Sequence, residues 1–208
     1  TDLTINDSIN IYDAKNYFGF PPYGYSEIQW CYNDSILSKE NTIPATVYYG
    51  IEKIRHYFQH NGTDTTDRLK ILVHIPTLDP NNGNIIPYNG ASWSQTEFIM
   101  SIGDGDAISA NAACDLDVLA HEYAHKVLIN HFKISYSDAT PPKKYETWAI
   151  HEGIADIFSI LVQKYTFGSI SWTVGEMMDL SDTDANLLPR NLAHPEDTNP
   201  PQALYYND

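Results

Sequence analysis

The chain has 208 residues, which is enough for one large domain or two small ones with a buried core. Hydrophobic residues make up 42% of the chain and aromatic residues 12%, a composition that excludes an intrinsically disordered protein. With 27 acidic and 12 basic side chains, the formal net charge is -15, so we expect no nucleic-acid partner and no anionic membrane partner. No apolar run approaches the ~20 residues of a membrane-spanning helix.

The N-terminal half is predicted to be rich in β-structure with one helix. Up to about residue 43, apolar and polar residues alternate and are interrupted by turns rich in Gly and Pro. Apolar residues at helical spacing predict a helix over residues 45–60. Strands are expected over residues 68–76 and 96–105, on either side of a segment rich in turn-forming residues.

From residue 115 the hydrophobic period changes from two to 3.6 residues and predicts two long helices. The first covers residues 115–132, and the second covers residues 143–165 after a breaker that contains two prolines. We therefore expect an α+β fold, in which a β-rich N-terminal lobe over residues 1–114 precedes a helical segment over residues 115–208.

The stretch "VLAHEYAHKVL" places two histidines and a glutamate at the spacing of a metal site. His121 and His125 are four residues apart, so both imidazoles lie on one helix face and can reach one ion. Glu122 lies one position round the helix, where it could take a proton from a water molecule. The alternative is an ordinary helix with two histidines, but this segment is too apolar for a solvated face, and burying these groups without a shared partner is costly.

The second helix carries "HEGIAD", which places two more carboxylates on one face. Glu152 and Asp156 are four residues apart and would be directed at the same space if the two helices pack antiparallel. Glu152 is then a candidate third ligand, and Asp156 a candidate acceptor for the other ring N–H of a ligand histidine. The alternative is that both acids only decorate the helix. Two histidines and one carboxylate, with a fourth position left for water, are typical of zinc sites that catalyse hydrolysis.

The segments "DVLAHEYAH", "HEGIADIFSILVQ", "SWTVGE" and "NGASWSQTEFIMSIGDGD" together resemble the thermolysin-like neutral zinc metallopeptidases. The resemblance covers roughly residues 45–176 and extends weakly to "PRNLAHPEDTNP". It implies a β-rich N-terminal lobe followed by the zinc-bearing helices, with the family's helical C-terminal lobe largely absent from these residues. It also implies that a cleft between the lobes binds an extended peptide.

By this resemblance, His121, His125 and Glu152 are the zinc ligands, Glu122 is the general base, and Asp156 orients a ligand histidine. The resemblance implies a secreted zinc endopeptidase that acts on peptide or protein substrates, with its active site completed by a C-terminal fragment. The alternative is a metallopeptidase-like binding or inhibitory module that retains zinc but is catalytically impaired.

The stretch "NGASW" resembles the edge strand on which the family pairs the backbone of its substrate. Ala91 and Trp93 stand in the matching positions, although Trp93 is equally well explained as a core aromatic behind the strand. The family usually has an asparagine directly before the alanine. Here Gly90 stands in that place and Asn89 lies one residue earlier.

The resemblance also suggests a calcium site and a catalytic tyrosine. Asp117 and Glu176 match acidic ligands of the family's double calcium site, but Ca²⁺ prefers several carboxylates. Tyr136 and Tyr145 both remain candidates for the tyrosine that stabilises the transition state. Three residues stand where the family has further acidic calcium ligands: Gln163, Ser171 and Thr173.

Overall fold

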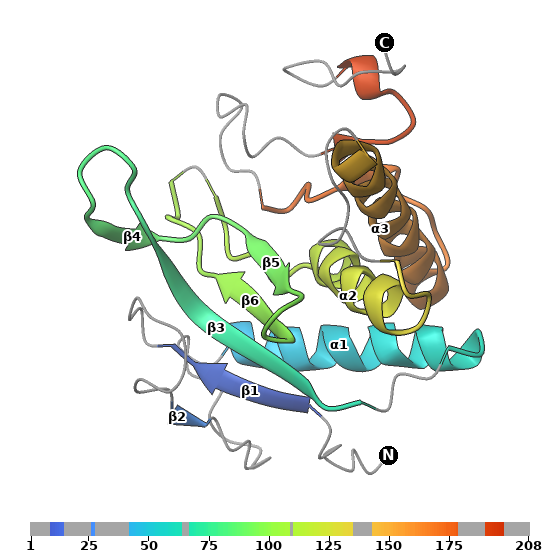
Figure 1. Ribbon diagram of the computed structural model, residues 1–208, viewed down its shortest axis with the longest axis horizontal. Helices are drawn as coiled ribbons and strands as arrows, with labels where there is room; N and C mark the ends of the chain where they lie inside the picture. The colour runs from blue at the N-terminus through green and yellow to red at the C-terminus, as the bar shows by residue number, and fades with distance from the viewer. Residues whose placement is uncertain are drawn as a thin grey trace.

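The fold is α+β, with a mixed β-sheet followed by long helices that carry the predicted site (Figure 1). The computed structural model describes residues 9–14, 26–27, 42–63, 67–108, 110–134, 143–178 and 190–197. Within these ranges, none of the helices combines the length and apolarity that crossing a membrane requires.

Six strands form the main sheet, in the order β2-β1-β3-β6-β5, and β4 pairs with β3 beyond this path. The central strand β3 pairs in parallel with both β1 and β6, whereas β5 pairs antiparallel with β6. Among the described residues, one side of β5 is therefore an edge of the sheet. The strands are β1 (Ile9–Asp13), β2 (Ser26–Glu27), β3 (Leu69–Leu78), β4 (Ile85–Pro87), β5 (Ala91–Ser94) and β6 (Ile99–Gly103).

Three helices follow the predicted periodicity, with small differences at their ends. Helix α1 (Thr42–His60) begins three residues before the expected start. Its first turn accommodates Pro44, because the first backbone N–H groups of a helix have no intrahelical partner to lose. Helices α2 (Leu116–Asn130) and α3 (Lys143–Phe167) lie within two residues of their expected bounds. A short sheet of β7 (Thr173–Val174) and β8 (Arg190–Asn191) and a 3₁₀ turn, η2 (Pro195–Asp197), follow α3.

The predicted strands at 68–76 and 96–105 correspond to β3 and β6. The turn that joins β5 to β6 includes the first residues of the second predicted strand, because the Phe98 N–H donates to the Ser94 carbonyl. The short strand β4 lies in the segment that the sequence predicts as turns.

Helix α2 is the central helix of the fold, and Figure 1 shows it between the β5–β6 side of the sheet and α3. Every residue from Asp117 to Leu128 is buried, as expected for a helix that is covered on all sides. Leu119 and Tyr123 pack in the main core, where Phe58 of α1 stacks on the Tyr123 ring. The polar residues of the metal motif are therefore held inside the protein by an apolar helix.

Gly103, the last residue of β6, allows the chain before β5 to approach closely. Its N–H donates to the Gly90 carbonyl at 2.9 Å, and a Cβ at position 103 would overlap the Tyr88 carbonyl. We expect Gly103→Ala to lower the free energy of unfolding by about 3 kcal/mol, at the upper end of typical overpacking costs.

Gly153 provides a matched control of opposite sign, since a Cβ there would meet nothing within 4 Å on the exposed face of α3. Gly153→Ala is expected to raise the free energy of unfolding by about 0.5–1 kcal/mol through helix propensity. Urea denaturation would measure both changes. Equal stability of Gly103→Ala and the unaltered chain would contradict the close approach at this strand end.

Candidate active site

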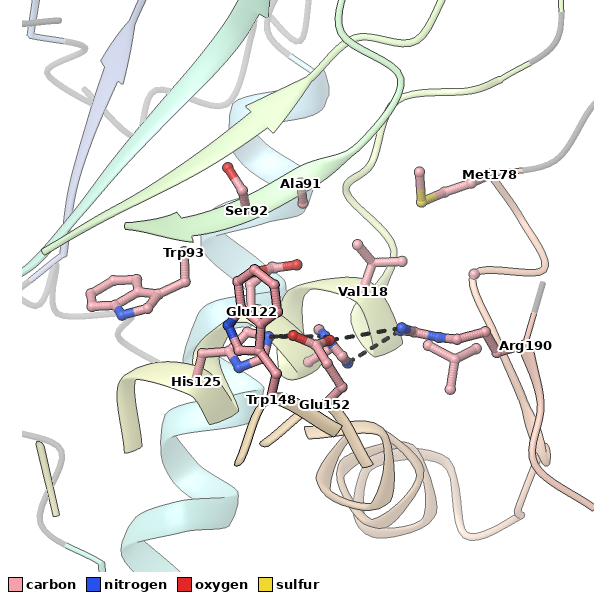
Figure 2. A pocket seen from close by; sticks show the side chains of 13 residues that line it. Ala91, Ser92, Trp93, Val118, Glu122, His125, Trp148, Glu152, Met178 and Arg190 are labelled. Carbon is pink, nitrogen blue, oxygen red and sulfur yellow. Dashed lines mark hydrogen bonds and ion pairs between the residues drawn. The ribbon is translucent and has the colours of Figure 1, made fainter. Parts of the chain in front are cut away.

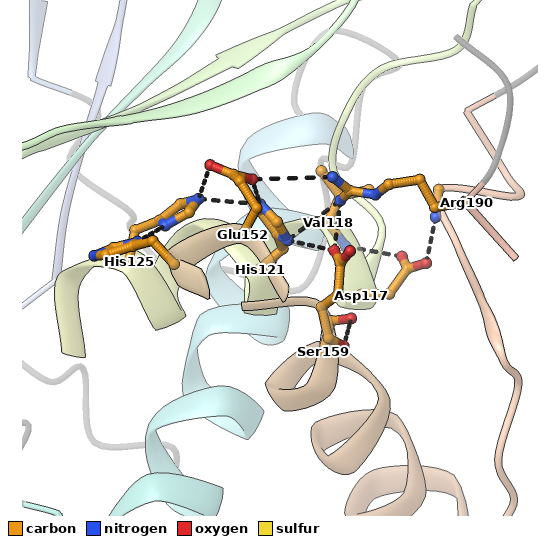
Figure 3. Close-up of polar contacts among 10 residues, drawn as sticks. Asp117, Val118, His121, His125, Glu152, Ser159 and Arg190 are labelled. Atoms are coloured by element: carbon orange, nitrogen blue, oxygen red, sulfur yellow. Dashed lines mark hydrogen bonds and ion pairs between the residues drawn. The ribbon is translucent and has the colours of Figure 1, made fainter. Parts of the chain in front are cut away.

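The helical spacing in α2 brings the two motif histidines together, and the packing of α3 against α2 adds Glu152 to them (Figure 3). The Nε2 atoms of His121 and His125 lie 3.0 Å apart. His121 Nε2 is 3.0 Å from one Glu152 carboxylate oxygen, and His125 Nε2 is 3.5 Å from the other. Among the described residues, this is the group of three metal-ligating side chains whose ligand atoms all lie within 4.8 Å of one another.

This donor set fits zinc. Two imidazole nitrogens and a carboxylate oxygen are ligands of hydrolytic zinc sites, which use three protein ligands. Both histidines are buried, whereas the Glu152 side chain is 48% exposed, so the group lies at the boundary between the core and the solvent. Helices α2 and α3 pack antiparallel, which is the arrangement that the sequence requires if Glu152 is to be the third ligand.

The electrostatics of the group favour a positive charge. Burial opposes protonation of His121, but hydrogen bonds to Asp156 and Glu152 outweigh it and raise the pKa of His121 to about 9. Burial and the nearby His121 charge lower the pKa of His125 to about 3. Burial alone would raise the pKa of Glu152, but the contacts with His121, His125 and Arg190 lower it to about 2. The carboxylates are thus arranged around one cationic position.

Asp156 holds His121 from the side opposite the ligand cluster. The Nδ1–H of His121 donates to the Asp156 carboxylate at 2.8 Å, which leaves Nε2 directed at Glu152 and His125. Arg190 of β8 donates to the same Asp156 oxygen at 2.7 Å, and its other terminal nitrogen lies 4.0 Å from Glu152. The sequence analysis did not assign Arg190. The one signal for it was the weak resemblance around "PRNLAHPEDTNP".

A cleft of about 460 Å³ opens beside the ligand group, between β5 and α3 (Figure 2). Ala91 and Trp93 of β5 both line it, and their substrate-binding role stays a prediction; Trp93 is only 7% exposed and also belongs to the core cluster. Trp148 of α3, four residues before Glu152, lines the opposite wall. Helical spacing alone could have found Trp148. The remaining lining residues are Ser92, Val118, His121, Glu122, His125, Glu152, Val174, Gly175, Met178 and Arg190.

Glu122 lies in this cleft with an electrostatic environment that suits proton transfer. Its side chain is largely buried, and burial raises the pKa of Glu122 to about 7, partly offset by the charge of His121 and by a hydrogen bond with the Trp93 backbone. A carboxyl group with a pKa close to the working pH is well placed to accept and return a proton.

Tyr88 explains the departure from the family pattern at Gly90. A Cβ at position 90 would lie 3.3 Å from the ring and hydroxyl of Tyr88, so the tyrosine fills the space that a side chain would take. The Tyr88 hydroxyl donates to the Ala91 carbonyl at 3.3 Å. Asn89 does not line the cleft, and its amide donates to the Asp106 carboxylate at 3.1 Å. A substrate-binding role for Asn89 stays a prediction.

The two predicted calcium ligands line a second cavity, of about 340 Å³. The Asp117 carboxylate accepts hydrogen bonds from the N–H groups of Gly175 and Val118, at 2.7 and 2.9 Å. The Ser171 hydroxyl donates to Glu176 at 2.9 Å. These acids thus accept hydrogen bonds from within the chain, and calcium binding here stays a prediction.

The residues that line the cleft do not decide between the two candidates for the catalytic tyrosine. Tyr145 lies in the first turn of α3 with 62% of its side chain exposed and does not line the cleft. Tyr136 lies outside the described residues.

Several known proteins are similar to this chain in sequence or in fold. The chain is 28% identical over 182 residues to a bacillolysin of Bacillus cereus and 30% identical over 175 residues to a thermolysin of Bacillus sp. (strain EA1). Each match covers 84% of this chain, and 28% and 29% of the respective relatives. The fold is similar to the precursor of protealysin, a metalloproteinase from Serratia proteamaculans, with a TM-score of 0.60 and 21% identity over 84% of this chain and 50% of that chain.

The match to a protein-family model assigns the chain to a family. Residues 3–128 match the model described as the thermolysin metallopeptidase catalytic domain, which is more than half of the chain. The matched residues include His121 and His125. Glu152, the third member of the ligand group, lies on α3, beyond the end of the match. The chain therefore belongs to the thermolysin-like metallopeptidase family.

Proposed function

We propose that this chain carries the metal centre and the substrate-binding edge of a zinc-dependent endopeptidase. The observation that carries the proposal is the convergence of His121, His125 and Glu152 at a cleft that also contains Glu122. These three side chains would hold the zinc ion. When bound, zinc would polarise water and the peptide carbonyl as a Lewis acid.

The chain's own residues would perform the remaining steps. Glu122 would take the proton from the attacking water and return it to the leaving amine. An extended peptide would pair with the open side of β5, where Ala91 and Trp93 border the cleft. Asp156, itself held by Arg190, would keep Nε2 of His121 directed at the metal.

The proposal includes the division into a lobe over residues 1–114 and a helical segment over residues 115–208, as well as a further polypeptide that completes the active site. Ile150 and Ile157 are each 56% exposed and Leu161 is 38% exposed on the face of α3 opposite Glu152, so this apolar stripe suits further packing on α3 but lies away from the metal site. Secretion, which the family resemblance implies, is part of the same proposal, and detection of the protein in culture medium would test it.

Metal removal is the direct test of the proposed function. We expect the purified chain, together with any polypeptide that copurifies with it, to bind about one zinc ion and to cleave casein or a peptide library. A chelator should reduce cleavage to background because the three ligands are then empty, and zinc but not magnesium should restore it, since Mg²⁺ favours oxygen ligands.

The other outcomes separate the two candidate functions. Zinc binding without cleavage of any peptide would favour the impaired binding or inhibitory module over the endopeptidase. A chain that binds no zinc at micromolar concentration would contradict both.

A further inference from the structure

We infer that His151 is a positioning residue that fixes the orientation and the tautomer of the metal ligand His125. This inference rests on the proposed zinc site and adds a residue to it. His151 directly precedes Glu152 on α3, and the sequence analysis assigned it no role. It is fully buried, at 0% exposure.

Three contacts with described residues orient the His151 ring. Its Nδ1 lies 2.7 Å from Nδ1 of His125, and its Nε2 lies 3.2 Å from the carbonyl oxygen of Ile134. The two imidazole rings are stacked, with their centroids 4.9 Å apart and their planes 18° from parallel. Both nitrogens of this buried side chain therefore have a partner, and each partner lies on a different segment of the chain.

The chemistry of these partners determines where the protons lie. A carbonyl oxygen only accepts, so Nε2 of His151 carries a hydrogen and donates it to Ile134. In the neutral ring, Nδ1 of His151 then holds a lone pair and accepts. One hydrogen must lie between the two Nδ1 atoms, and it therefore belongs to His125.

This tautomer is the one that metal binding requires. With its hydrogen on Nδ1, His125 has a lone pair on Nε2, the atom directed at His121 and Glu152. Orientation of a ligand histidine through its other ring nitrogen is a general feature of metal sites. The chain thus supports its two ligand histidines differently, with the Asp156 carboxylate on His121 and a neutral imidazole on His125.

The neutral acceptor also limits the charge of the site. Glu122, Glu152 and Asp156 already lie around the two histidines, and Arg190 contacts Glu152 and Asp156. An imidazole at position 151 orients His125 without adding a fourth carboxylate to this cluster. It also connects the metal site to Ile134, in the segment that leaves α2.

Zinc affinity of two position-151 variants tests the inference, measured by competition with a chromogenic chelator at pH 7.5. His151→Leu keeps an apolar volume but offers no acceptor, and we expect it to lower zinc affinity about 10–100-fold. In His151→Asn the side-chain oxygen can accept from His125 Nδ1, and we expect an affinity within about threefold of the unaltered chain. His60→Leu, an exposed histidine on α1, is the matched control and should bind zinc normally.

Long-range ¹H–¹⁵N NMR of the unaltered, zinc-loaded chain provides a readout that does not depend on how the variants fold. We expect hydrogen on Nδ1 of His125 and on Nε2 of His151. Hydrogen on Nδ1 of His151, or a Leu variant that binds zinc as tightly as the Asn variant, would overturn the inference while leaving the proposed function intact. If the unaltered chain bound no zinc, the proposed function would fall and the inference with it.

Discussion

Replacing Glu122 by glutamine is expected to lower kcat for peptide cleavage about 10²–10⁴-fold, the range in which a positioned general base contributes. Glutamine has nearly the same volume and can keep the contact with the Trp93 backbone, but its amide cannot accept a proton from water. Because Glu122 is not a member of the ligand group, zinc content should remain about one per chain. The measurement is steady-state cleavage of a fluorogenic peptide, with zinc quantified on the same sample.

The matched control is Glu97→Gln, which removes an exposed carboxylate in the turn between β5 and β6 and should cleave at the unaltered rate. Two results would count against the assigned role of Glu122. One is a variant that retains most of its kcat, and the other is a variant that loses activity because it has lost its zinc.

Replacing Glu152 by alanine is expected to weaken zinc binding more than ~100-fold. Loss of a residue that only supports a ligand lowers metal affinity by about 10–100-fold, and loss of a ligand itself should cost more. Glu152 supplies the single carboxylate of the group, and its removal leaves two imidazoles, one fewer than the three protein ligands of a hydrolytic site. The side chain is about half exposed, so the metal-free chain should lose no more than about 1 kcal/mol of folding stability. Chelator competition and urea denaturation of the metal-free protein would separate the two effects.

Glu146→Ala provides the control on the same helix, since Glu146 is an exposed acid in the first turn of α3. It should bind zinc as the unaltered chain does. A Glu152→Ala variant with normal zinc affinity would show that another group completes the metal site, and the three-ligand assignment would then be wrong.

The sequence predicted the ligand group well because each half of it is a local pattern. A helix places residues i and i+4 on one face whatever surrounds it, so the pair His121 and His125 and the pair Glu152 and Asp156 follow from spacing alone. The apolar residues around the histidine pair also predicted that both histidines would be buried, which they are. From the sequence, the two pairs were expected to face each other only if the two helices pack antiparallel. Helices α2 and α3 do pack in this way, so His121 contacts both Glu152 and Asp156.

Residues whose partners lie far along the chain were predicted less well. Arg190 reaches Asp156 and approaches His121 across 69 residues, from a strand of two residues that gives almost no periodic signal. Tyr88 covers Gly90 because the chain enters β5 tightly against Gly103, which side-chain spacing cannot reveal. Asn89 donates to Asp106, seventeen residues along the chain, a contact that the sequence did not indicate, and its substrate-binding role stays a prediction.

By itself, the sequence determined four properties of this protein. They are the types of the metal-ligating side chains, the spacing of these side chains, the α+β fold class and the family. Only the tertiary structure decided that Arg190 and His151 also support those donors, because the local sequence around each is the same whether or not its side chain reaches the site. His151 illustrates the physical reason. Its role depends on a 2.7 Å contact between two helices and on a carbonyl at Ile134, and such contacts are set by packing rather than by helical period.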